Sequence, residues 1–304
     1  MTTTQRFQGQ DLLRVGHDDN YLLLAPDYGG RLVRWVLRGQ DILYWPDDAD
    51  WNRVAKVRGG NPLLFPFIGR HFVDGEPGKW RDRHGTTHDL PQHGFARDLP
   101  FDVSELSGDA VSLTLAASNQ THAGYPFSFA FTATYRLLPD GLEVSLRTRN
   151  NRDAGAAPLP YYAGHHFYFA LPHQARGQSR IVMPGTSRVR QQPDGSLTAP
   201  EPGEPAYRLD GPRLQDTFHV LQAVGVGDIG SCRLELPART IEIELDSANA
   251  VPWHAVTTWT ERDDSDFYCV EPWLGLPNAI HNGHGLRWLP AGADETATCR
   301  LLIR

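Results

Sequence analysis

The chain has 304 residues and a formal net charge of −7, with 40% hydrophobic and 10% aromatic residues. Its acidic and basic side chains are interspersed without a basic run, which argues against a nucleic-acid partner because phosphate backbones are bound through clustered cations. The mean hydropathy is −0.42, and no apolar stretch is long enough to cross a bilayer, so the sequence does not predict a membrane protein.

The first 19 residues lack the charged-then-apolar order of a secretory signal, so we expect a cytoplasmic protein. The three cysteines, Cys232, Cys269 and Cys299, are odd in number and form no CxxC pair. This pattern fits a reducing compartment and argues against a disulfide framework or a zinc finger. All-β chains of this length commonly form one unit, so we expect a single domain over residues 1–304.

The N-terminal third predicts a hairpin followed by a loop. Apolar runs at residues 21–26 and 31–37 flank a turn at 27–30, which is typical of two paired strands. Residues 59–70, GGNPLLFPFIGR, combine three glycines and two prolines with apolar side chains, so we expect a buried irregular loop that ends at Arg70. Residues 71–90 are rich in Gly, Asp and His, and we expect them to form an exposed excursion.

The clearest pattern lies in the middle of the chain. Apolar residues alternate with smaller or polar ones over residues 127–137, a turn follows at 139–141, and the alternation returns over 142–147, which predicts a long antiparallel hairpin. Further strands are predicted at 111–115, 240–245 and 298–304, and no convincing amphipathic helix is present. The sequence therefore predicts an all-β fold, a large antiparallel β-sandwich, with a long polar and proline-rich loop at 184–215.

One histidine stands inside an aromatic strand. In the stretch GHHFYFALP, His166 shares a strand face with Tyr168 and points away from His165. It is interpreted either as a hydrogen-bonded packing residue or as a general acid or base whose pKa is tuned by desolvation. A metal site at His84, His88 and His93 is disfavoured, because zinc ligands need rigid elements and a supporting shell.

Four stretches carry a family resemblance. In chain order they are GGNPLLFPFIGR ending at Arg70, QHGFAR with His93 and Arg97, GHHFYFALP with His166, and VEPWLGLPNAIH with Glu271. Together they resemble the aldose 1-epimerase (galactose mutarotase-like) family, including its hexose-6-phosphate epimerase branch. The resemblance implies a galactose mutarotase-like sandwich that interconverts the α and β anomers of a hexose or hexose phosphate.

The resemblance also implies a role for individual residues. The family base in an E-P-W-like stretch matches Glu271, and the acid in an H-x-Y-F pattern matches His166. Side chains that hold the sugar match Arg70, His93 and Asp216. Arg97 is either a salt-bridging residue or a second substrate contact, and its convergence with Arg70 would favour a sugar phosphate because the guanidinium fork suits phosphate.

This chemistry needs one base and one acid, which we expect on opposite sides of one sugar, with no metal and no organic cofactor. Trp253 and Trp273 are expected to desolvate Glu271 and so raise its pKa toward the working pH. The expected partner is a small sugar or sugar phosphate, with a monomer or weak homodimer as the assembly. The alternative is a non-catalytic carbohydrate-binding or sugar-sensing β-sandwich.

Overall fold

Antiparallel strands make up most of the computed structural model, which describes residues 2–153, 155–184, 186–221, 230–246 and 251–304. The helices within these ranges are short and lie in connections between strands. They are the α-helices α1 (Asn119–His122) and α2 (Ala279–Asn282) and the 3-10 helices η1 (Trp51–Lys56), η2 (Ala96–Asp98), η3 (His173–Gln178) and η4 (Pro212–Leu214). The prediction of an all-β fold is confirmed.

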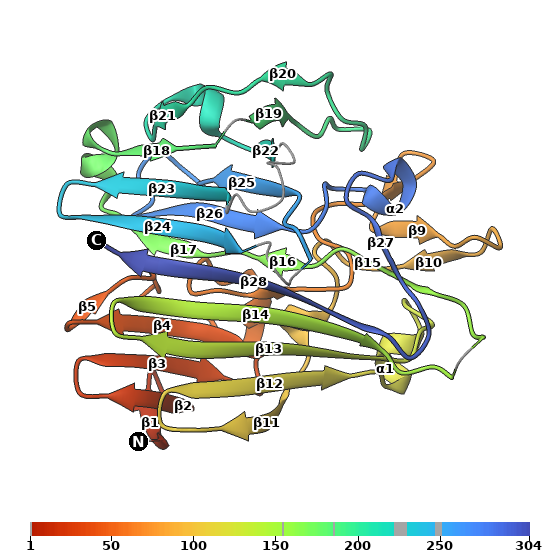
Figure 1. Ribbon diagram of the computed structural model, residues 1–304, viewed down its shortest axis with the longest axis horizontal. Helices are drawn as coiled ribbons and strands as arrows, with labels where there is room; N and C mark the ends of the chain where they lie inside the picture. Colours follow the sequence, from red (N-terminus) through yellow and green to blue (C-terminus); the bar gives the residue numbers. More distant parts are fainter. Residues whose placement is uncertain (1, 154, 185, 222–229, 247–250) are drawn as a thin grey trace.

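A nine-stranded sheet forms one face of the molecule (Figure 1). In spatial order its strands are β11 (Asp102–Leu106), β12 (Ala110–Ala116), β13 (Phe129–Leu138), β14 (Gly141–Asn150), β28 (Asp294–Ile303), β24 (Arg239–Asp246), β23 (Gly230–Leu236), β18 (Arg180–Val182) and β21 (Ala206–Arg208). The predicted central hairpin is β13 and β14, in which Phe131 lies opposite Thr148 and Tyr135 opposite Val144. Burial alternates along β13, so one face of the sheet is packed and the other is wetter.

An eight-stranded sheet carries the site. Its strands are β20 (Glu201–Pro202), β19 (Thr186–Val189), β22 (Thr217–Leu221), β25 (Ala255–Trp259), β26 (Phe267–Trp273), β16 (Gly164–His165) and β6 (Leu63–Leu64), with β17 (Tyr168–Ala170) also paired to β26. All seven residues of β26 are buried. A polar side chain on this central strand is therefore enclosed by protein and needs a partner.

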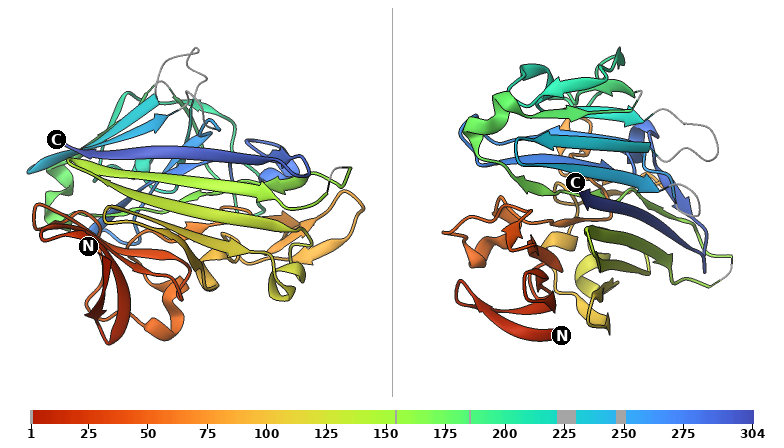
Figure 2. Two further views of the ribbon diagram at one scale, coloured as in Figure 1. Left: turned by 60° about the horizontal axis from the view of Figure 1, so that its bottom comes forward. Right: turned by 60° about the vertical axis from the view of Figure 1, so that its left-hand side comes forward.

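The N-terminal strands form a separate five-stranded sheet. Its order is β1 (Thr2–Phe7), β2 (Gln10–His17), β3 (Asn20–Ala25), β4 (Arg31–Leu37) and β5 (Gln40–Asp41). The predicted opening hairpin is β3 and β4, and β2 contacts β12 of the nine-stranded sheet. Figure 2 shows these strands, in red, at the lower left of both views.

Three two-stranded pairs complete the described strands. They are β7 (Phe72–Val73) with β8 (Glu76–Pro77), β9 (Lys79–Arg81) with β10 (Thr87–Asp89), and β15 (Leu159–Tyr161) with β27 (Arg287–Leu289).

The main core lies between the two large sheets. Phe65, which follows β6, stacks on Phe131 of β13 with ring centroids 4.4 Å apart. Asn61 donates a hydrogen bond from Nδ2 to the hydroxyl of Tyr135 across the same interface, at 3.4 Å. One continuous cluster of buried apolar side chains includes residues of both sheets. The buried irregular loop predicted at residues 59–70 thus fills the space between them.

Two segments differ from the sequence-based expectation. Residues 71–90 are not simply an exposed excursion, because they form two small hairpins, and Trp80 is buried with its indole N–H bonded to the carbonyl of Gly124. The segment predicted as a long loop at 184–215 contains β19, β20, β21 and η4. Short strands rich in Gly, Pro and polar residues carry too little period-two pattern to be recognised.

The three cysteines are buried and free. No helix in the described ranges is both long and apolar enough to span a bilayer.

Candidate active site

A pocket of about 380 Å³ opens on the eight-stranded sheet and gathers the residues singled out from the sequence. All six of them line it: Arg70, His93, Arg97, His166, Asp216 and Glu271. Three of them precede β11, and the other three lie at separate places after β15, so only the folded chain brings them together.

Strand register places His166 against Glu271. Gly164 of β16 pairs with Trp273 of β26, and Tyr168 of β17 pairs with Cys269 of the same strand. Midway between these two antiparallel pairs, His166 faces Glu271, in the arrangement of a cross-strand pair. On the other side of β26, Thr257 of β25 pairs with Glu271.

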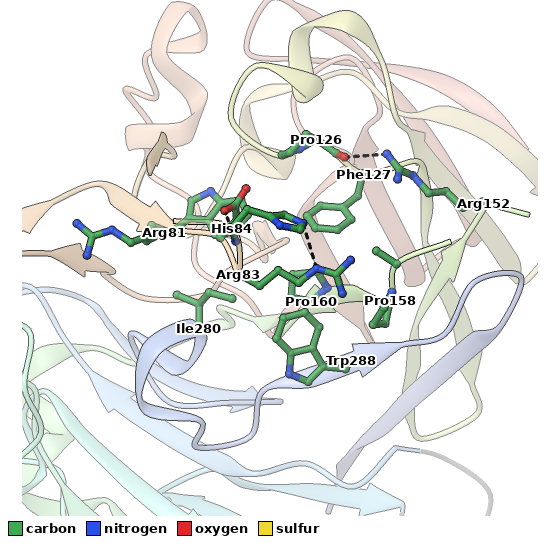
Figure 3. Close-up of a pocket in the computed structure, with 13 residues that line it drawn as sticks. Arg81, Arg83, His84, Pro126, Phe127, Arg152, Pro158, Pro160, Ile280 and Trp288 are labelled. Atoms are coloured by element: carbon green, nitrogen blue, oxygen red, sulfur yellow. Dashed lines mark hydrogen bonds between the residues drawn. The ribbon is translucent and has the colours of Figure 1, made fainter. Parts of the chain in front are cut away.

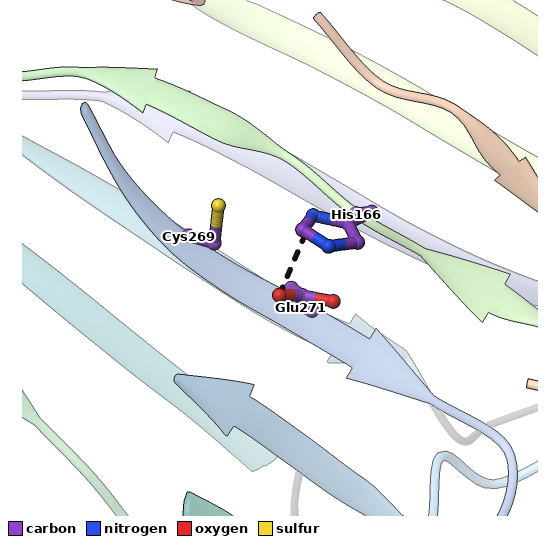
Figure 4. Close-up of side chains that lie close together, drawn as sticks. All are labelled: His166, Cys269 and Glu271. Atoms are coloured by element: carbon purple, nitrogen blue, oxygen red, sulfur yellow. Dashed lines mark ion pairs between the residues drawn. The ribbon is translucent and has the colours of Figure 1, made fainter. Parts of the chain in front are cut away.

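The two side chains are in direct contact. His166 Nδ1 lies 3.4 Å from Glu271 Oε1 (Figure 4), and Glu271 Oε2 accepts a hydrogen bond from the Trp273 indole N–H at 3.1 Å. The Glu271 side chain is 1% exposed and that of His166 10% exposed. The expectation that the two groups stand on opposite sides of a sugar is therefore wrong. They stand side by side, which suits a reaction at two oxygens bonded to one carbon.

Burial opposes charge on both members of the pair. It is the largest influence on Glu271 and raises the pKa of this carboxyl well above its ordinary value, although the Trp273 hydrogen bond works in the other direction. Burial also lowers the pKa of His166 well below its ordinary value, and the nearby Arg97 cation adds to the effect. Their contact favours opposite charges instead. Whether both groups are neutral or carry opposite charges, the pair shares one titratable proton. It can therefore donate a proton at one atom and accept one at another.

Aromatic rings fix the imidazole of His166. Its ring stacks on Tyr168 with centroids 4.6 Å apart and planes 7° from parallel, and the edge of Trp259 approaches at 5.7 Å. Its backbone N–H donates to Asn61 Oδ1 at 2.9 Å. His165 points the other way, as predicted, and stacks on Phe167 in the core.

His93 is held by a reciprocal backbone arrangement. Its N–H donates to the carbonyl of Gly69 at 2.9 Å, and the Gly69 N–H donates to His93 Nδ1 at 3.1 Å. A neutral His93 therefore carries its proton on Nε2, the atom that lies 3.1 Å from the side-chain amide of Gln92. Burial lowers the pKa of His93 well below its ordinary value, which keeps it neutral. Gly94 allows this loop to approach, because a Cβ there would lie 2.0 Å from the carbonyl oxygen of Phe65.

Arg70 and Asp216 occupy one part of the pocket. Arg70 Nε donates to Gln191 Oε1 at 3.2 Å, and the charge of Arg70 acts on Asp216. Burial is nevertheless the stronger influence and raises the pKa of Asp216. Asp216 and His93 both have positive φ angles, 48° and 68°, which are strained for residues with a side chain.

Arg97 belongs to a second group of cations. It acts electrostatically on His93 and His166, and its own pKa is lowered by burial and by Arg58. Its Nη2 donates to the carbonyl of Gln92 at 2.9 Å. Arg58 lies over the Trp259 ring at 5.2 Å and pairs with Glu261 at 3.0 Å.

Several lining residues were missed from the sequence. Lys56 and Arg58 follow or end a 3-10 helix that no pattern marked, and Trp259 ends β25 without a motif. In total four cationic side chains and two carboxylates line the pocket. The expectation for Trp253 is wrong, because it packs against His165 and bonds to the carbonyl of Thr298 instead of lining the pocket.

A second pocket of about 280 Å³ shares no lining residue with the first. It lies by the β9–β10 hairpin and is lined by rings and cations that include Phe127, Trp288 and Arg83 (Figure 3). His84 also lines it, whereas His88 stacks on Trp80 with centroids 4.7 Å apart. Since His93 belongs to the first pocket, the three histidines do not form a common metal site.

The antiparallel sandwich has the galactose mutarotase-like fold. A galactose mutarotase-like protein from Clostridium acetobutylicum matches 100% of this chain and 98% of its own, with a TM-score of 0.80 at 18% identity. The family model described as aldose 1-epimerase matches residues 11–292. The chain therefore belongs to the aldose 1-epimerase family.

Two curated relatives carry the name "Putative glucose-6-phosphate 1-epimerase". The protein from Cenchrus ciliaris is 28% identical over 153 residues, and the protein from Escherichia coli is 26% identical over 157 residues. These matches cover 47% and 50% of this chain, and 41% and 48% of the relatives. The chain thus spans less than half the length of these two proteins.

Proposed function

We propose that this protein is a mutarotase that interconverts the α and β anomers of a hexose or hexose phosphate. The observation that carries the proposal is the contact between His166 and Glu271, 3.4 Å apart at the base of the pocket. Membership of the aldose 1-epimerase family supports it. A protein that only bound sugar would not need an adjacent acid and base that share one proton.

The reaction uses the two tautomers of the pair. With the shared proton on His166, the Glu271 carboxylate takes the proton of the C1 hydroxyl while the imidazolium donates to the ring oxygen. The ring opens to an aldehyde, and both side chains become neutral, which is the state that burial favours. Rotation about C1–C2 followed by the reverse transfers closes the ring as the other anomer.

The remaining lining residues hold the sugar. Neutral His93 donates from Nε2, and Arg70 and Asp216 offer a donor and an acceptor in another part of the pocket. Trp259 and Trp273 present apolar surface to the C–H faces of the ring. No step requires a metal or an organic cofactor.

The charge of the pocket favours an anionic substituent. Arg58, Arg97 and Lys56 add positive charge beside the reacting pair, in a chain whose overall charge is negative. A phosphate is bound well by such a group, because guanidinium donors form charge-assisted hydrogen bonds with its oxygens. We therefore place hexose phosphates first among the candidate substrates, and free hexoses second.

Magnetisation-exchange NMR on glucose 6-phosphate, with polarimetry on freshly dissolved α-glucose and α-galactose, tests the function directly. Wild-type protein is expected to accelerate anomer exchange on at least one of these sugars, and Glu271→Gln is expected to abolish the acceleration. Sugar binding with unaccelerated exchange on all three would support the carbohydrate-binding alternative and contradict the proposal.

A further inference from the structure

Cys269 lies beneath the reacting pair without taking part in the proposed reaction. It is two residues before Glu271 on β26, so both side chains project from the same face of the strand. Cys269 is 0% exposed and does not line the sugar pocket. Figure 4 shows its sulfur on the same side of β26 as the carboxylate of Glu271 and the ring of His166.

The three side chains bring metal-ligand atoms together. One ligand atom each from His166, Cys269 and Glu271 lies within 4.8 Å of the others. In addition, His166 Nδ1 is buried and has no hydrogen-bond partner among the described residues. A lone pair that faces a carboxylate and a thiol without a hydrogen bond is what a cation would use.

We propose that His166, Cys269 and Glu271 bind one borderline-soft divalent cation, Zn²⁺ in particular, and that the bound cation inhibits the protein. The inhibition, unlike the binding, rests on the proposed mutarotase function. A cation at this position would occupy the carboxylate and the imidazole that exchange protons with the sugar, so binding and turnover exclude each other.

The donor set selects the kind of cation. Zinc is bound by thiolate, imidazole and carboxylate ligands, and sites with three protein ligands leave a fourth position for water. Here the fourth position would face the pocket, where the His166 side chain is 10% exposed. Hard cations such as Mg²⁺ prefer an octahedron of oxygen ligands and have little affinity for a thiolate.

The distances require only a small adjustment. Tetrahedral zinc with bonds of about 2.0–2.1 Å to nitrogen and oxygen holds these two ligand atoms about 3.4 Å apart. The separation of His166 Nδ1 and Glu271 Oε1 is 3.4 Å. The widest separation in the cluster, within 4.8 Å, closes by a side-chain movement of about 1 Å, since zinc–sulfur bonds are about 2.3 Å long. Binding releases the thiol proton and the proton shared by the pair to solvent.

Cadmium is a suitable probe for direct binding, because a cadmium–thiolate bond absorbs in the ultraviolet. We expect wild-type protein without sugar to show this absorption at one Cd²⁺ per chain, and Cys269→Ala to lose it. Cys232→Ala is the matched control, because Cys232 is also buried and free but lies on β23 of the other sheet; it should bind Cd²⁺ as the wild type does. Cys269→Ser serves if the alanine variant does not fold.

Inhibition is measured as the Zn²⁺ concentration that halves mutarotation. Because loss of a supporting group alone lowers metal affinity 10- to 100-fold, loss of the thiolate ligand should raise this concentration at least about tenfold in Cys269→Ala. Cys232→Ala should match the wild type, and Mg²⁺ should not inhibit. Equal Cd²⁺ absorption in wild type and Cys269→Ala, or no absorption in either, would overturn the metal site. Absence of mutarotation in the uninhibited protein would refute the proposed function instead, and the cadmium titration would still decide the site.

Discussion

His166, in the short link between β16 and β17, faces Glu271 of β26, with Nδ1 of the imidazole 3.4 Å from Oε1 of the carboxylate. The register that places them is set by backbone pairing on both sides, at Gly164 with Trp273 and at Tyr168 with Cys269. Because strand pairing fixes the backbone on both sides of His166 and at Glu271, the two proposed reacting groups are held together by the sheet itself.

Removing either half of the pair should abolish most catalysis. Glu271→Gln and His166→Gln keep a polar side chain but cannot exchange protons, so we expect each to lower kcat by about 10²- to 10⁴-fold. Exchange NMR on the preferred sugar measures the change. Retained sugar affinity in calorimetry would separate lost chemistry from lost binding, and wild-type rates in both variants would contradict the assigned roles.

The pH dependence of kcat/KM should follow the single proton of the pair. A second proton at low pH or loss of the shared proton at high pH leaves no donor and acceptor together, so the profile is expected to be bell-shaped. Burial lowers the pKa of His166 and raises the pKa of Glu271. The acid limb should therefore lie below the ordinary histidine pKa of 6.5, and the alkaline limb above the ordinary glutamate pKa of 4.5. An acid limb at pH 6.5 or higher would contradict this model.

The cations should discriminate between phosphorylated and free sugars. Charge-assisted hydrogen bonds contribute about 1.5–3 kcal/mol, so Arg97→Gln should lower kcat/KM for a hexose 6-phosphate by roughly 10- to 100-fold and for the free hexose much less. Raising the ionic strength should weaken the binding of the phosphorylated sugar more than that of the free sugar, because salt screens the attraction between the cations and the phosphate. Arg53→Gln, in η1 but outside the pocket, is the matched control. Equal losses of kcat/KM on both sugars would contradict a contact between Arg97 and the phosphate.

The loop that holds His93 should depend on one glycine. Gly94 has a φ of +73°, and a Cβ there would meet the Phe65 carbonyl oxygen at 2.0 Å. Gly94→Ala should therefore lower the free energy of unfolding by at least about 2 kcal/mol and reduce activity by displacing His93. Gly85 has a similar φ of +86°, but a Cβ there would have no atom within 4 Å. Gly85→Ala should therefore lower the free energy of unfolding by only about 1 kcal/mol. Denaturant titration measures the free energy of unfolding of both variants. Equal losses in the two would contradict the steric argument.

His165 should make the fold sensitive to acid. Burial lowers its pKa to about 3, so between pH 6.5 and 3 the unfolded chain binds a proton that the folded chain does not. The stability that depends on neutral His165 is complete above pH 6.5 and falls as the pH drops, by up to about 1.4 kcal/mol per pH unit. His165→Phe should flatten the acid slope of the unfolding free energy. An unchanged slope would contradict a contribution from His165 and assign the acid sensitivity to other buried histidines, among them His71 and His219, whose pKa values burial lowers to about 4 and about 3.

Period-two alternation was sufficient to predict the neighbouring strands β12, β13, β14, β28 and β24 of the nine-stranded sheet. Along β13 and β14 every second side chain is buried, so the pattern in the sequence records the environment directly. Short strands such as β19 and β20 escaped prediction because they pair over only two to four residues. Trp80 escaped it as well, since a single buried ring inside a polar hairpin leaves no periodic signal.

The lining residues were predictable where they stood inside a recognisable stretch. His166, Glu271 and His93 each lie in such a stretch, and all three line the pocket. Arg58 and Trp259 do not, because their place depends on how η1 and the end of β25 meet in space. The proximity of Cys269 to His166 was not predicted for the same reason. It follows from the register between strands about 100 residues apart in the chain.

The division of the pocket between strands and loops has an evolutionary consequence. Glu271 belongs to the paired strand β26 and His166 to the short link between β16 and β17, both of which pair with β26, whereas Arg58, Arg70 and Asp216 belong to connections outside this pairing. Loops tolerate insertion and substitution far better than central strands. Under the proposed function, descendants of this scaffold can therefore acquire a different sugar preference by mutation of the connections alone, while the proposed proton-transferring pair is inherited unchanged.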